Sequence, residues 1–487
     1  MTDKLAICLL ASEVAPLSKT GGLADVAAAL TKHLHAVGHD ARLFTPAYAS
    51  VDRAAVGAQP VAGLTGLPLV VGPQTYVFSV LRGRLPASSA PVYLIDCPQL
   101  YARASLYTSD PDEHLRFLGF TRAALTACQQ LGWAPQILHC HDWHAAFAPL
   151  FLKSSYAREP LFAATRTLLT IHNIGYQGIF PSAQVDDLGL GEHLAMLYQP
   201  DLAAGQINAL RHGILYADAI TTVSPTHAHE ITTDEYGMGM QDSLRSRAAD
   251  LSGILNGVDY DEWDPRRDRY LLQHFDPGHL QVKAALKRVF MKRLGLGVRG
   301  DVPLAGIVSR LAAQKGIELM YEALPKVLEA RELAFVALGS GEVQYEEFFT
   351  TLAQRFPGRV YFRRGYDDEL AHWIEAASDL YLMPSRYEPC GLNQMYSLRY
   401  GTIPVVRRTG GLADSVEHYN RDTGTGTGVV FNDFDGPALE WALNTALDLY
   451  AQPAHRAQLR ANGMQRDFSW QRQGALYEAL YARLTAA

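Results

Sequence analysis

The sequence has few cysteines, no concentration of basic charge and no hydrophobic run long enough to span a membrane. Its five cysteines are scattered and odd in number, which argues against a disulfide framework and favours a reducing compartment such as the cytoplasm. The formal net charge of -7, with no basic tract, argues against a nucleic-acid partner. The apolar stretch "LAICLLA" at 5–11 is too short for a spanning helix and is interpreted as a buried strand, so no membrane partner is expected.

What the chain does have is length and a regular alternation of strand-like and helix-like patterns. At 487 residues it is too long for one hydrophobic core, so two domains are expected. A strand, a Gly turn, a helix and a second strand are predicted over 5–46, and the alternation recurs from 303 on, including a helix over 313–330. This pattern predicts two α/β domains with doubly wound parallel sheets. Turn signals in "ILNGVDYDEWDP" place the boundary near 254.

A near-repeat occurs at the two ends of the chain. The segment "KTGGLAD" lies at 19–25 and "RTGGLAD" at 408–414, and each is predicted to join a strand to a helix. Free backbone N–H groups and the positive end of a helix dipole would suit a phosphate there, with Lys19 or Arg408 beside it. The simpler interpretation is a tight Gly-Gly turn, and common ancestry of the two halves stays open. Neither copy matches a P-loop or a complete dinucleotide-binding fingerprint.

Other strand ends in the second half carry polar and charged side chains. Arg310 and Lys315 suit a diphosphate, although such a pair is often only solvated. Glu388, in "PSRYEPCGLNQ", would either cap the next helix or bind sugar hydroxyls. Tyr366 would either stack on a base or fill its loop. Ligands of doubly wound sheets bind at the carboxyl ends of strands, which is where these residues are predicted to lie.

In the first half, Asp142 and His172 follow two predicted strands. A zinc site built from His139, His141, Asp142 and His144 is disfavoured, because His144 is expected on the next helix and no fourth ligand is evident. A buried core histidine is the alternative for His172.

Six motifs in this order resemble those of bacterial glycogen synthases and plant starch synthases: "KTGGLADV", "HDWH", "IHN", "SRLAAQKG", "EPCGL" and "RTGGLAD". The resemblance runs from about residue 5 to "DFSWQRQGALYEALY" at 467–481. It implies a GT-B fold, with two Rossmann-like domains facing across a deep cleft. The expected domains are 1–253, onto which a final helix at 466–487 packs back, and 254–465. It also implies transfer of glucose from ADP-glucose to the nonreducing end of an α-1,4-glucan such as glycogen, with retention of configuration and without a metal or other cofactor.

The resemblance also implies roles for individual residues. Those expected at the reacting groups are His172, Glu388, Asp142, Arg310 and Lys315. Those expected to bind the donor are Lys19, Gly21, Gly22, Asp25, Asn256, Tyr366, Cys390, Gly391, Leu392, Thr409, Gly410 and Gly411. Within this set, Glu388 is expected on the glucose hydroxyls, Tyr366 on adenine and Asp142 toward the acceptor.

Three other functions fit the same patterns. One is a nucleotide-sugar glucosyltransferase with a small-molecule acceptor, one is a noncatalytic glucan-binding protein of the same fold, and one is a nucleotide-sugar epimerase. The sequence does not separate ADP-glucose from UDP-glucose, because stacking on a tyrosine tolerates either base, and it is silent on oligomeric state.

Overall fold

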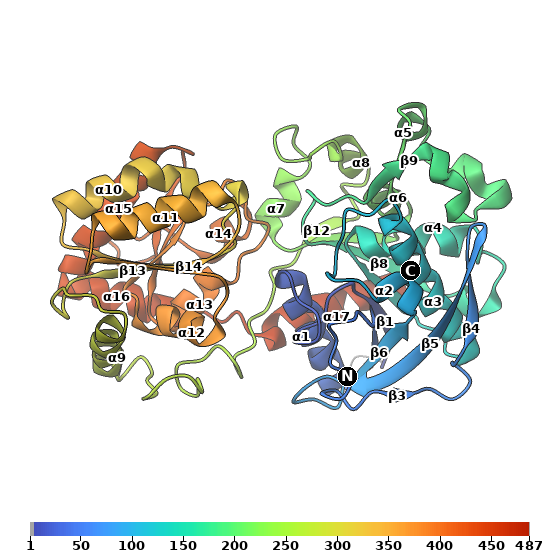
Figure 1. Cartoon of the computed structure of the whole chain (residues 1–487), viewed down its shortest axis with the longest axis horizontal. Helices are drawn as coiled ribbons and strands as arrows, with labels where there is room; N and C mark the ends of the chain where they lie inside the picture. The colour runs from blue at the N-terminus through green and yellow to red at the C-terminus, as the bar shows by residue number, and fades with distance from the viewer. Residues whose placement is uncertain (1–3, 487) are drawn as a thin grey trace. The chain divides into compact units, whose positions relative to one another are not determined.

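A mostly parallel sheet flanked by helices forms the centre of each of two units. The computed structural model describes residues 4–486 (Figure 1). One unit runs up to Gly257 and resumes at Trp470, and the other spans Val258–Ser469. Both divisions fall a few residues after the boundaries predicted at 253 and 465. Among the described residues, no helix combines the length and hydrophobicity that a membrane span requires.

The first unit has a ten-stranded sheet in the order β12-β11-β8-β7-β1-β2-β6-β5-β3, with β4 paired to β5. The strands from β12 to β6 run parallel, while β5 is antiparallel to β6, and β3 and β4 are antiparallel to β5. The strands are β1 (Ala6–Leu10), β2 (Asp40–Pro46), β3 (Gln59–Pro60), β4 (Leu67–Val71), β5 (Gln74–Arg84), β6 (Pro91–Asp96), β7 (Ile137–His141), β8 (Arg166–Ile171), β11 (Ala219–Thr222) and β12 (Leu251–Gly253). A separate pair consists of β9 (Ile179–Pro181) and β10 (Gln206–Asn208).

Helices of different length connect these strands. The α-helices are α1 (Gly22–Ala36), α2 (Pro98–Tyr101), α3 (Glu113–Gln130), α4 (Ala148–Lys153), α5 (Gln199–Ala203), α6 (Ala209–Tyr216), α7 (Pro225–Glu230), α8 (Gln241–Ser246) and α17 (Trp470–Ala486). The 3-10 turns are η1 (Trp143–Ala145), η2 (Pro160–Phe162), η3 (Ser182–Leu188) and η4 (Gly191–Met196).

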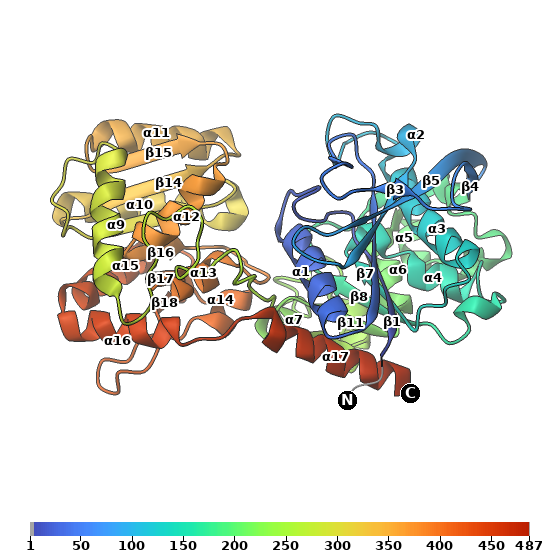
Figure 2. The ribbon, with the colours of Figure 1, turned by 90° about the horizontal axis from the view of Figure 1, so that it is seen from below.

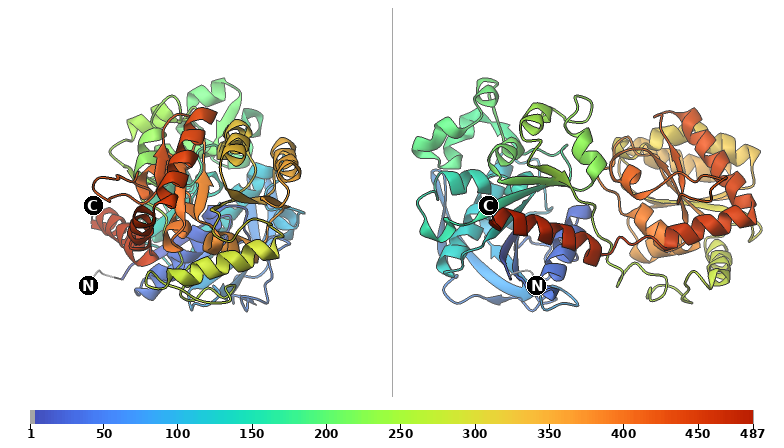
Figure 3. Two further views of the ribbon diagram at one scale, coloured as in Figure 1. Left: turned by 90° about the vertical axis from the view of Figure 1, so that its left-hand side faces the viewer. Right: turned by 180° about the vertical axis from the view of Figure 1, so that it is seen from behind.

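The last helix belongs to the first unit, although it follows the second unit in the sequence. Helix α17 lies along this unit beside α1 (Figures 2 and 3). The two helices touch closely, because a Cβ on Gly474 would lie 2.2 Å from the His33 ring. His33 Nε2 is also 2.9 Å from Glu478 Oε1. The apolar face of α17, including Tyr477 and Tyr481, is buried in the core of this unit.

The second unit has a six-stranded, wholly parallel sheet in the order β15-β14-β13-β16-β17-β18. The strands are β13 (Leu304–Val308), β14 (Ala334–Gly339), β15 (Val360–Arg364), β16 (Leu380–Met383), β17 (Ile403–Arg407) and β18 (Val429–Phe431). The helices are α9 (Leu280–Arg293), α10 (Met320–Ala330), α11 (Val343–Arg355), α12 (Asp368–Ala377), α13 (Asn393–Arg399), α14 (Gly410–Ser415), α15 (Gly436–Ala451) and α16 (Pro453–Met464).

Helices cover both faces of this sheet and bury the alternating side chains of its strands. Helices α10, α11 and α15 lie on one face, with α9 and α12 on the other (Figure 1). Successive residues of β14 therefore enter different cores: Phe335 and Ala337 enter the first, and Val336 and Leu338 the second. This two-sided burial explains why the strands read as continuous apolar runs rather than as alternating ones.

The predicted helix over 313–330 is wrong in its first part. The segment forms two short 3-10 turns, η5 (Ala313–Lys315) and η6 (Ile317–Leu319), and α10 begins only at Met320. Gly316 separates the turns with a φ of +66°, and a Cβ there would lie 2.0 Å from the carbonyl oxygen of Pro384. The chain breaks at this glycine because only glycine permits both the backbone conformation and the close approach.

Candidate active site

Each sheet has one place where the strand order reverses, and several of the predicted site residues follow the two strands that flank it. In the second unit the order reverses between β13 and β16, which precede the Arg310–Lys315 and Glu388 loops. In the first unit it reverses between β1 and β7, which precede the Lys19 loop and Asp142. At such a switch point the loops diverge to opposite faces and leave a crevice at the carboxyl edge, where ligands bind.

In the second unit, Lys315 and Glu388 form an ion pair across the switch point. Lys315 Nζ lies 2.6 Å from Glu388 Oε2, and Ser385 Oγ donates to the same oxygen at 3.0 Å. Glu388 is buried, and its side chain is 7% exposed against 19% for Lys315. Helix α13 starts later, at Asn393, and no side chain caps it, so the capping role considered for Glu388 is wrong.

The second Gly-Gly loop packs directly against the Glu388 loop. The amide of Gly411 donates to the carbonyls of Glu388, at 3.0 Å, and Pro389, at 3.2 Å. Gly410 has a φ of +42°, and a Cβ there would lie 2.0 Å from the Glu388 oxygen. The free Gly411 amide expected for phosphate is therefore engaged within the protein, while Thr409 is the N-cap residue of α14.

The loop after Glu388 is fixed from behind by one glutamine. Gln394 Nε2 donates to the carbonyls of Cys390 and Gly391, both at 3.0 Å. Cys390 is buried, and Gly391, with a φ of +72°, leads into Leu392 at the start of α13. The role of these three residues in binding the donor stays a prediction.

Two predicted donor-binding side chains of this unit are solvent-exposed. Arg310 follows β13 and is exposed. Tyr366 follows β15, is 72% exposed, and donates its hydroxyl to Asp368 Oδ1 at 2.8 Å. Tyr366 is therefore largely exposed to solvent, and its stacking on a base stays a prediction.

In the first unit, Glu13 occupies the turn of the first Gly-Gly loop. Its carboxylate accepts the amides of Thr20, at 2.5 Å, and Gly21, at 3.2 Å. Gly22 begins α1. Lys19 Nζ lies 2.8 Å from Asp25 Oδ1, and both side chains are partly exposed. The expectation of free amides is therefore wrong for Thr20 and Gly21, because a carboxylate of the protein already occupies this anion-binding position.

Asp142 joins the ends of β7 and β8 in a strained conformation. Its φ of 55° and ψ of -172° lie in a region used almost only by glycine, at a cost of about 1–3 kcal/mol. Two hydrogen bonds maintain this conformation. The Asp142 amide donates to the carbonyl oxygen of Thr170, and Asp142 Oδ1 accepts the amide of His172 at 2.7 Å. Burial raises the pKa of Asp142 to about 7.

His172 is a neutral group in this environment. It is 9% exposed, and burial lowers its pKa to about 3. Its Nε2 lies 2.9 Å from Nδ1 of His141. His172 can therefore hydrogen-bond a sugar but does not carry positive charge near neutral pH.

The remaining histidines of "HCHDWH" have partners inside the protein. His139 bonds Tyr481 of α17 at 2.8 Å and Thr170 at 2.6 Å. His144 lies in η1 and stacks on Tyr107, with ring centroids 4.8 Å apart. The zinc arrangement considered for them is not among the possible metal-binding groups of the described residues.

A shallow, open hollow lies beside Asp142 in the first unit. It contains exposed aromatic and apolar groups: Tyr176 is 56% and Ile179 is 54% exposed. Its lining consists of Trp143, Gly175, Tyr176, Gln177, Gly178, Ile179 and Met238. Flat aromatic faces of this kind are suited to the apolar faces of sugar rings.

Asn256 lies next to the point where the chain leaves the first unit. It is 4% exposed, and its Oδ1 is buried without a hydrogen-bond partner. Gly257 follows it and packs on Trp470, where the chain returns. The adjoining residues of the second unit are paired, because the Val258 amide donates to Phe468 at 2.7 Å. The two connections between the units thus run side by side.

Sequence reasoning missed several side chains that shape these sites. Glu13 lies three residues after the end of β1, so its place near a strand end was a usable signal. Tyr107, whose hydroxyl donates to Glu13 at 2.7 Å, and Gln394, which holds the Cys390 loop, had none. Their roles arise from contacts between segments distant in the sequence or hidden within a motif.

Comparisons with known proteins cover nearly the whole chain. Residues 6–246 match the starch synthase catalytic domain, and residues 292–466 match glycosyl transferases group 1. A glycogen synthase of Anaeromyxobacter dehalogenans is 47% identical over 99% of this chain and 100% of its own length. Glycogen synthase 1 of Geobacter metallireducens is 42% identical, over 99% of this chain and 96% of its own.

Solved structures agree with these relatives. The catalytic domain of starch synthase IV from Arabidopsis thaliana, bound to ADP and acarbose, is 34% identical and covers 100% of both chains with a TM-score of 0.91. A sucrose-phosphate synthase from Thermosynechococcus elongatus has a TM-score of 0.63 at 19% identity, which shows a shared fold alone. With its two α/β units of the GT-B fold and its full-length likeness to these enzymes, the chain belongs to the glycogen synthase family of glycosyltransferases.

Proposed function

We propose that this enzyme elongates glycogen, transferring glucose from ADP-glucose to the nonreducing end of an α-1,4-glucan with retention of configuration. The observation that carries the proposal is the ion pair at the switch point of the second unit. There, Lys315 pairs with buried Glu388, and Arg310 follows the neighbouring strand. The full-length likeness to a starch synthase solved with ADP supports ADP as the nucleotide part of the donor.

The reaction breaks the bond between the anomeric carbon of glucose and the distal phosphate of ADP. The electron pair of that bond leaves with the phosphate, so stabilising this developing charge is the main task of the protein. Arg310 and Lys315 are proposed to bind the diphosphate, and Lys19 to reach it from the first unit. The leaving phosphate is proposed to accept the proton of the acceptor 4-hydroxyl as the new glycosidic bond forms on the same face.

Glu388 is proposed to orient glucose rather than to attack it. Its Oε2 is held by Lys315 and Ser385, so the carboxylate is fixed in position and charge-balanced. His172 is proposed to hydrogen-bond the sugar as a neutral ring, because its pKa is lowered to about 3. Asp142 is proposed to hold the acceptor side of the site in shape, since its carboxylate binds the His172 amide.

The hollow beside Asp142 is the proposed acceptor surface. A glucan presents flat apolar faces between its hydroxyls, which match the exposed ring of Tyr176. A small-molecule acceptor would not need this open surface. We therefore favour the polymer acceptor over a small-molecule one.

The decisive experiment incubates the enzyme with radiolabelled ADP-glucose and glycogen, and in parallel with UDP-glucose. We expect ethanol-insoluble label and a higher initial rate with the ADP donor. Label that stays soluble would favour a small-molecule acceptor, and no ADP release would favour a noncatalytic glucan binder. An epimerised nucleotide sugar formed without any acceptor would favour an epimerase.

We also propose that the transfer needs no metal or other cofactor and takes place in the cytoplasm. The cations named above can neutralise the diphosphate without a divalent ion, so activity in EDTA should equal the untreated rate. Loss of activity in EDTA that returns with added metal would contradict this. The location is supported by the five cysteines, which are all buried free thiols.

A further inference from the structure

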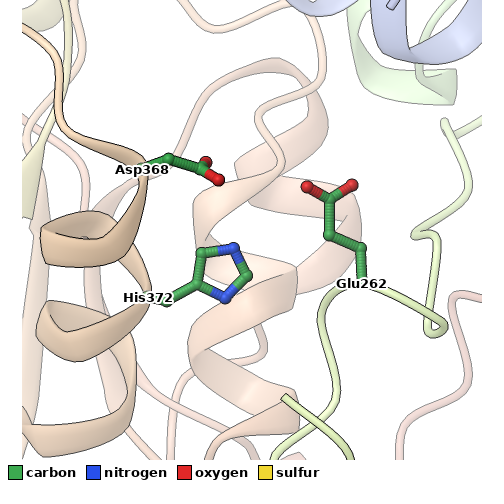
Figure 4. A group of neighbouring side chains, drawn as sticks. All are labelled: Glu262, Asp368 and His372. Atoms are coloured by element: carbon green, nitrogen blue, oxygen red, sulfur yellow. The ribbon is translucent and has the colours of Figure 1, made fainter. Parts of the chain in front are cut away.

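Three potential metal ligands lie together in the second unit, away from the Lys315–Glu388 junction in the sequence. Glu262, Asp368 and His372 each offer one ligand atom, and these atoms lie within 4.8 Å of one another. Asp368 is the first residue of α12 and His372 lies one turn later, so both face the same side of the helix. Figure 4 shows the two carboxylates and one ring nitrogen of His372 pointing toward a common space.

His372 presents an unpaired nitrogen to this space. Its side chain is 1% exposed, and Nε2 is buried without a hydrogen-bond partner in the described chain. The other nitrogen, Nδ1, lies 2.8 Å from Asp268 Oδ2. A buried nitrogen without a partner is costly, and in native proteins it calls for an explanation such as an unseen ion.

The Asp268–His372 pair has the arrangement that surrounds metal-binding histidines. Such a histidine donates one N–H to a carboxylate, which fixes its tautomer and directs the lone pair of the other nitrogen toward the ion. Asp268 is itself held by the hydroxyl of Tyr400 at 2.6 Å. The ring orientation is fixed by Trp263, which stacks on it with centroids 3.8 Å apart. His372 is thus oriented before any ligand binds.

Asp368 is likewise fixed in place. Its Oδ2 accepts the hydroxyl of Tyr270 at 2.6 Å, and its Oδ1 accepts that of Tyr366 at 2.8 Å. Arg269 lies 3.6 Å from Oδ2, and its side chain is 72% exposed. Three carboxylates, those of Glu262, Asp268 and Asp368, lie around the His372 ring. The local charge favours a bound cation.

We propose that Glu262, Asp368 and His372 form a site for a divalent transition-metal ion, of which Zn²⁺ is the representative. One imidazole nitrogen and two carboxylate oxygens are ligands that zinc accepts, with water completing the coordination. The imidazole disfavours Mg²⁺ and Ca²⁺, which prefer oxygen ligands. The metal takes no part in the proposed transfer step, although Asp368 also holds the hydroxyl of Tyr366. Its role is to tie the first segment of this unit, which contains Glu262, to α12.

The test measures zinc binding to the full chain by equilibrium dialysis and elemental analysis. The wild type should bind zinc at a site that Glu262→Gln weakens by at least about 10- to 100-fold, the usual cost of losing even an outer-shell partner. Glu262 is exposed, so this variant should fold normally. The matched control is Asp261→Asn, which removes the neighbouring carboxylate, 87% exposed, and should bind as the wild type does.

A second readout uses the tryptophan stacked on His372. Co²⁺ bound at Nε2 should quench Trp263 emission in the wild type and in Asp261→Asn, but not in Glu262→Gln or Asp368→Asn at the same concentration. This comparison does not require a His372 variant, which would disturb the ring stack. Equal zinc affinity in wild type and Glu262→Gln, or no zinc retained by the wild type, would overturn the proposal. In that case, Glu262, Asp368 and His372 are a side-chain cluster that holds no metal ion.

Discussion

The ion pair between Lys315 and Glu388 leads to a prediction whose effects on folding stability and on the rate of glucose transfer can be measured separately. Replacing Lys315 by Met removes the only ion-pair partner that the described residues give to Glu388, whose side chain is 7% exposed. Removing one partner of a buried pair typically costs about 3–5 kcal/mol of unfolding free energy. If Lys315 also stabilises the leaving phosphate, the rate should fall a further 100- to 1000-fold or so, about 3–4 kcal/mol of barrier.

The two effects are separated by a second substitution. Glu388→Gln added to Lys315→Met removes the orphan charge, so most of the lost stability should return, while transfer stays low. Calorimetry is the suitable assay for stability, because a chain of two units need not unfold in one step. Rates are measured as labelled glucan formed, well below the transition temperature of each variant.

The control is Lys315→Arg, which keeps a cation near Glu388 and should retain more activity than Lys315→Met. The reasoning is refuted if folded Lys315→Met transfers glucose within about tenfold of the wild type, since one well-placed donor is expected to matter more than that. Lys315 would then only balance the charge of Glu388.

Three further predictions concern single residues. Arg310→Ala should slow transfer roughly 100- to 1000-fold without lowering the melting temperature, because Arg310 is exposed, and an unchanged rate would remove it from the diphosphate site. Asp142→Asn should flatten the pH dependence of stability: burial raises the pKa of Asp142 from 3.8 to about 7, so the folded state holds its proton longer than the unfolded state. The stability of the wild type relative to this variant should therefore fall as the pH rises from about 4 to 7. The expected loss is about 4 kcal/mol, because roughly three pKa units correspond to 1.36 kcal/mol each. Parallel stability–pH profiles of the two proteins would contradict this prediction. Tyr176→Ala should raise the KM for glycogen severalfold, because a lost aromatic contact is worth about 0.5–1.5 kcal/mol. The KM for ADP-glucose should stay unchanged. A change in the KM for ADP-glucose instead would place Tyr176 at the donor rather than at the acceptor.

The fold could be predicted from the sequence because its strands and helices depend on residue patterns that are local in the chain. Buried parallel strands require continuous apolar runs, and the helices between them require apolar residues at a 3.6-residue period. The segment "PLAGIVSR" and the strands and helices that follow it could therefore be predicted from the sequence alone. The strand-end rule then located Arg310, Glu388, Asp142 and the two Gly-Gly loops. The facing of the two Gly-Gly loops across a cleft stays a prediction.

Local patterns failed where a distant contact decided the structure. The helix expected from 313 breaks at Gly316, because the Pro384 carbonyl approaches too closely for any side chain. Helical periodicity contains no information about that approach. Lys315 therefore lies in a 3-10 turn rather than at a helix start, and this position lets it reach Glu388.

The sequence by itself determined the two α/β units, the family, and the strand ends that carry polar side chains, since each depends on residue type and spacing along the chain. Tertiary structure alone decided which polar groups at these strand ends are already hydrogen-bonded within the protein. The Thr20 and Gly21 amides donate to Glu13, and the Gly411 amide donates to the Glu388 carbonyl. It also decided which groups are held without charge or in strain, as His172 and Asp142 are. The physical reason is that hydrogen-bond partners and desolvation depend on which segments meet in space.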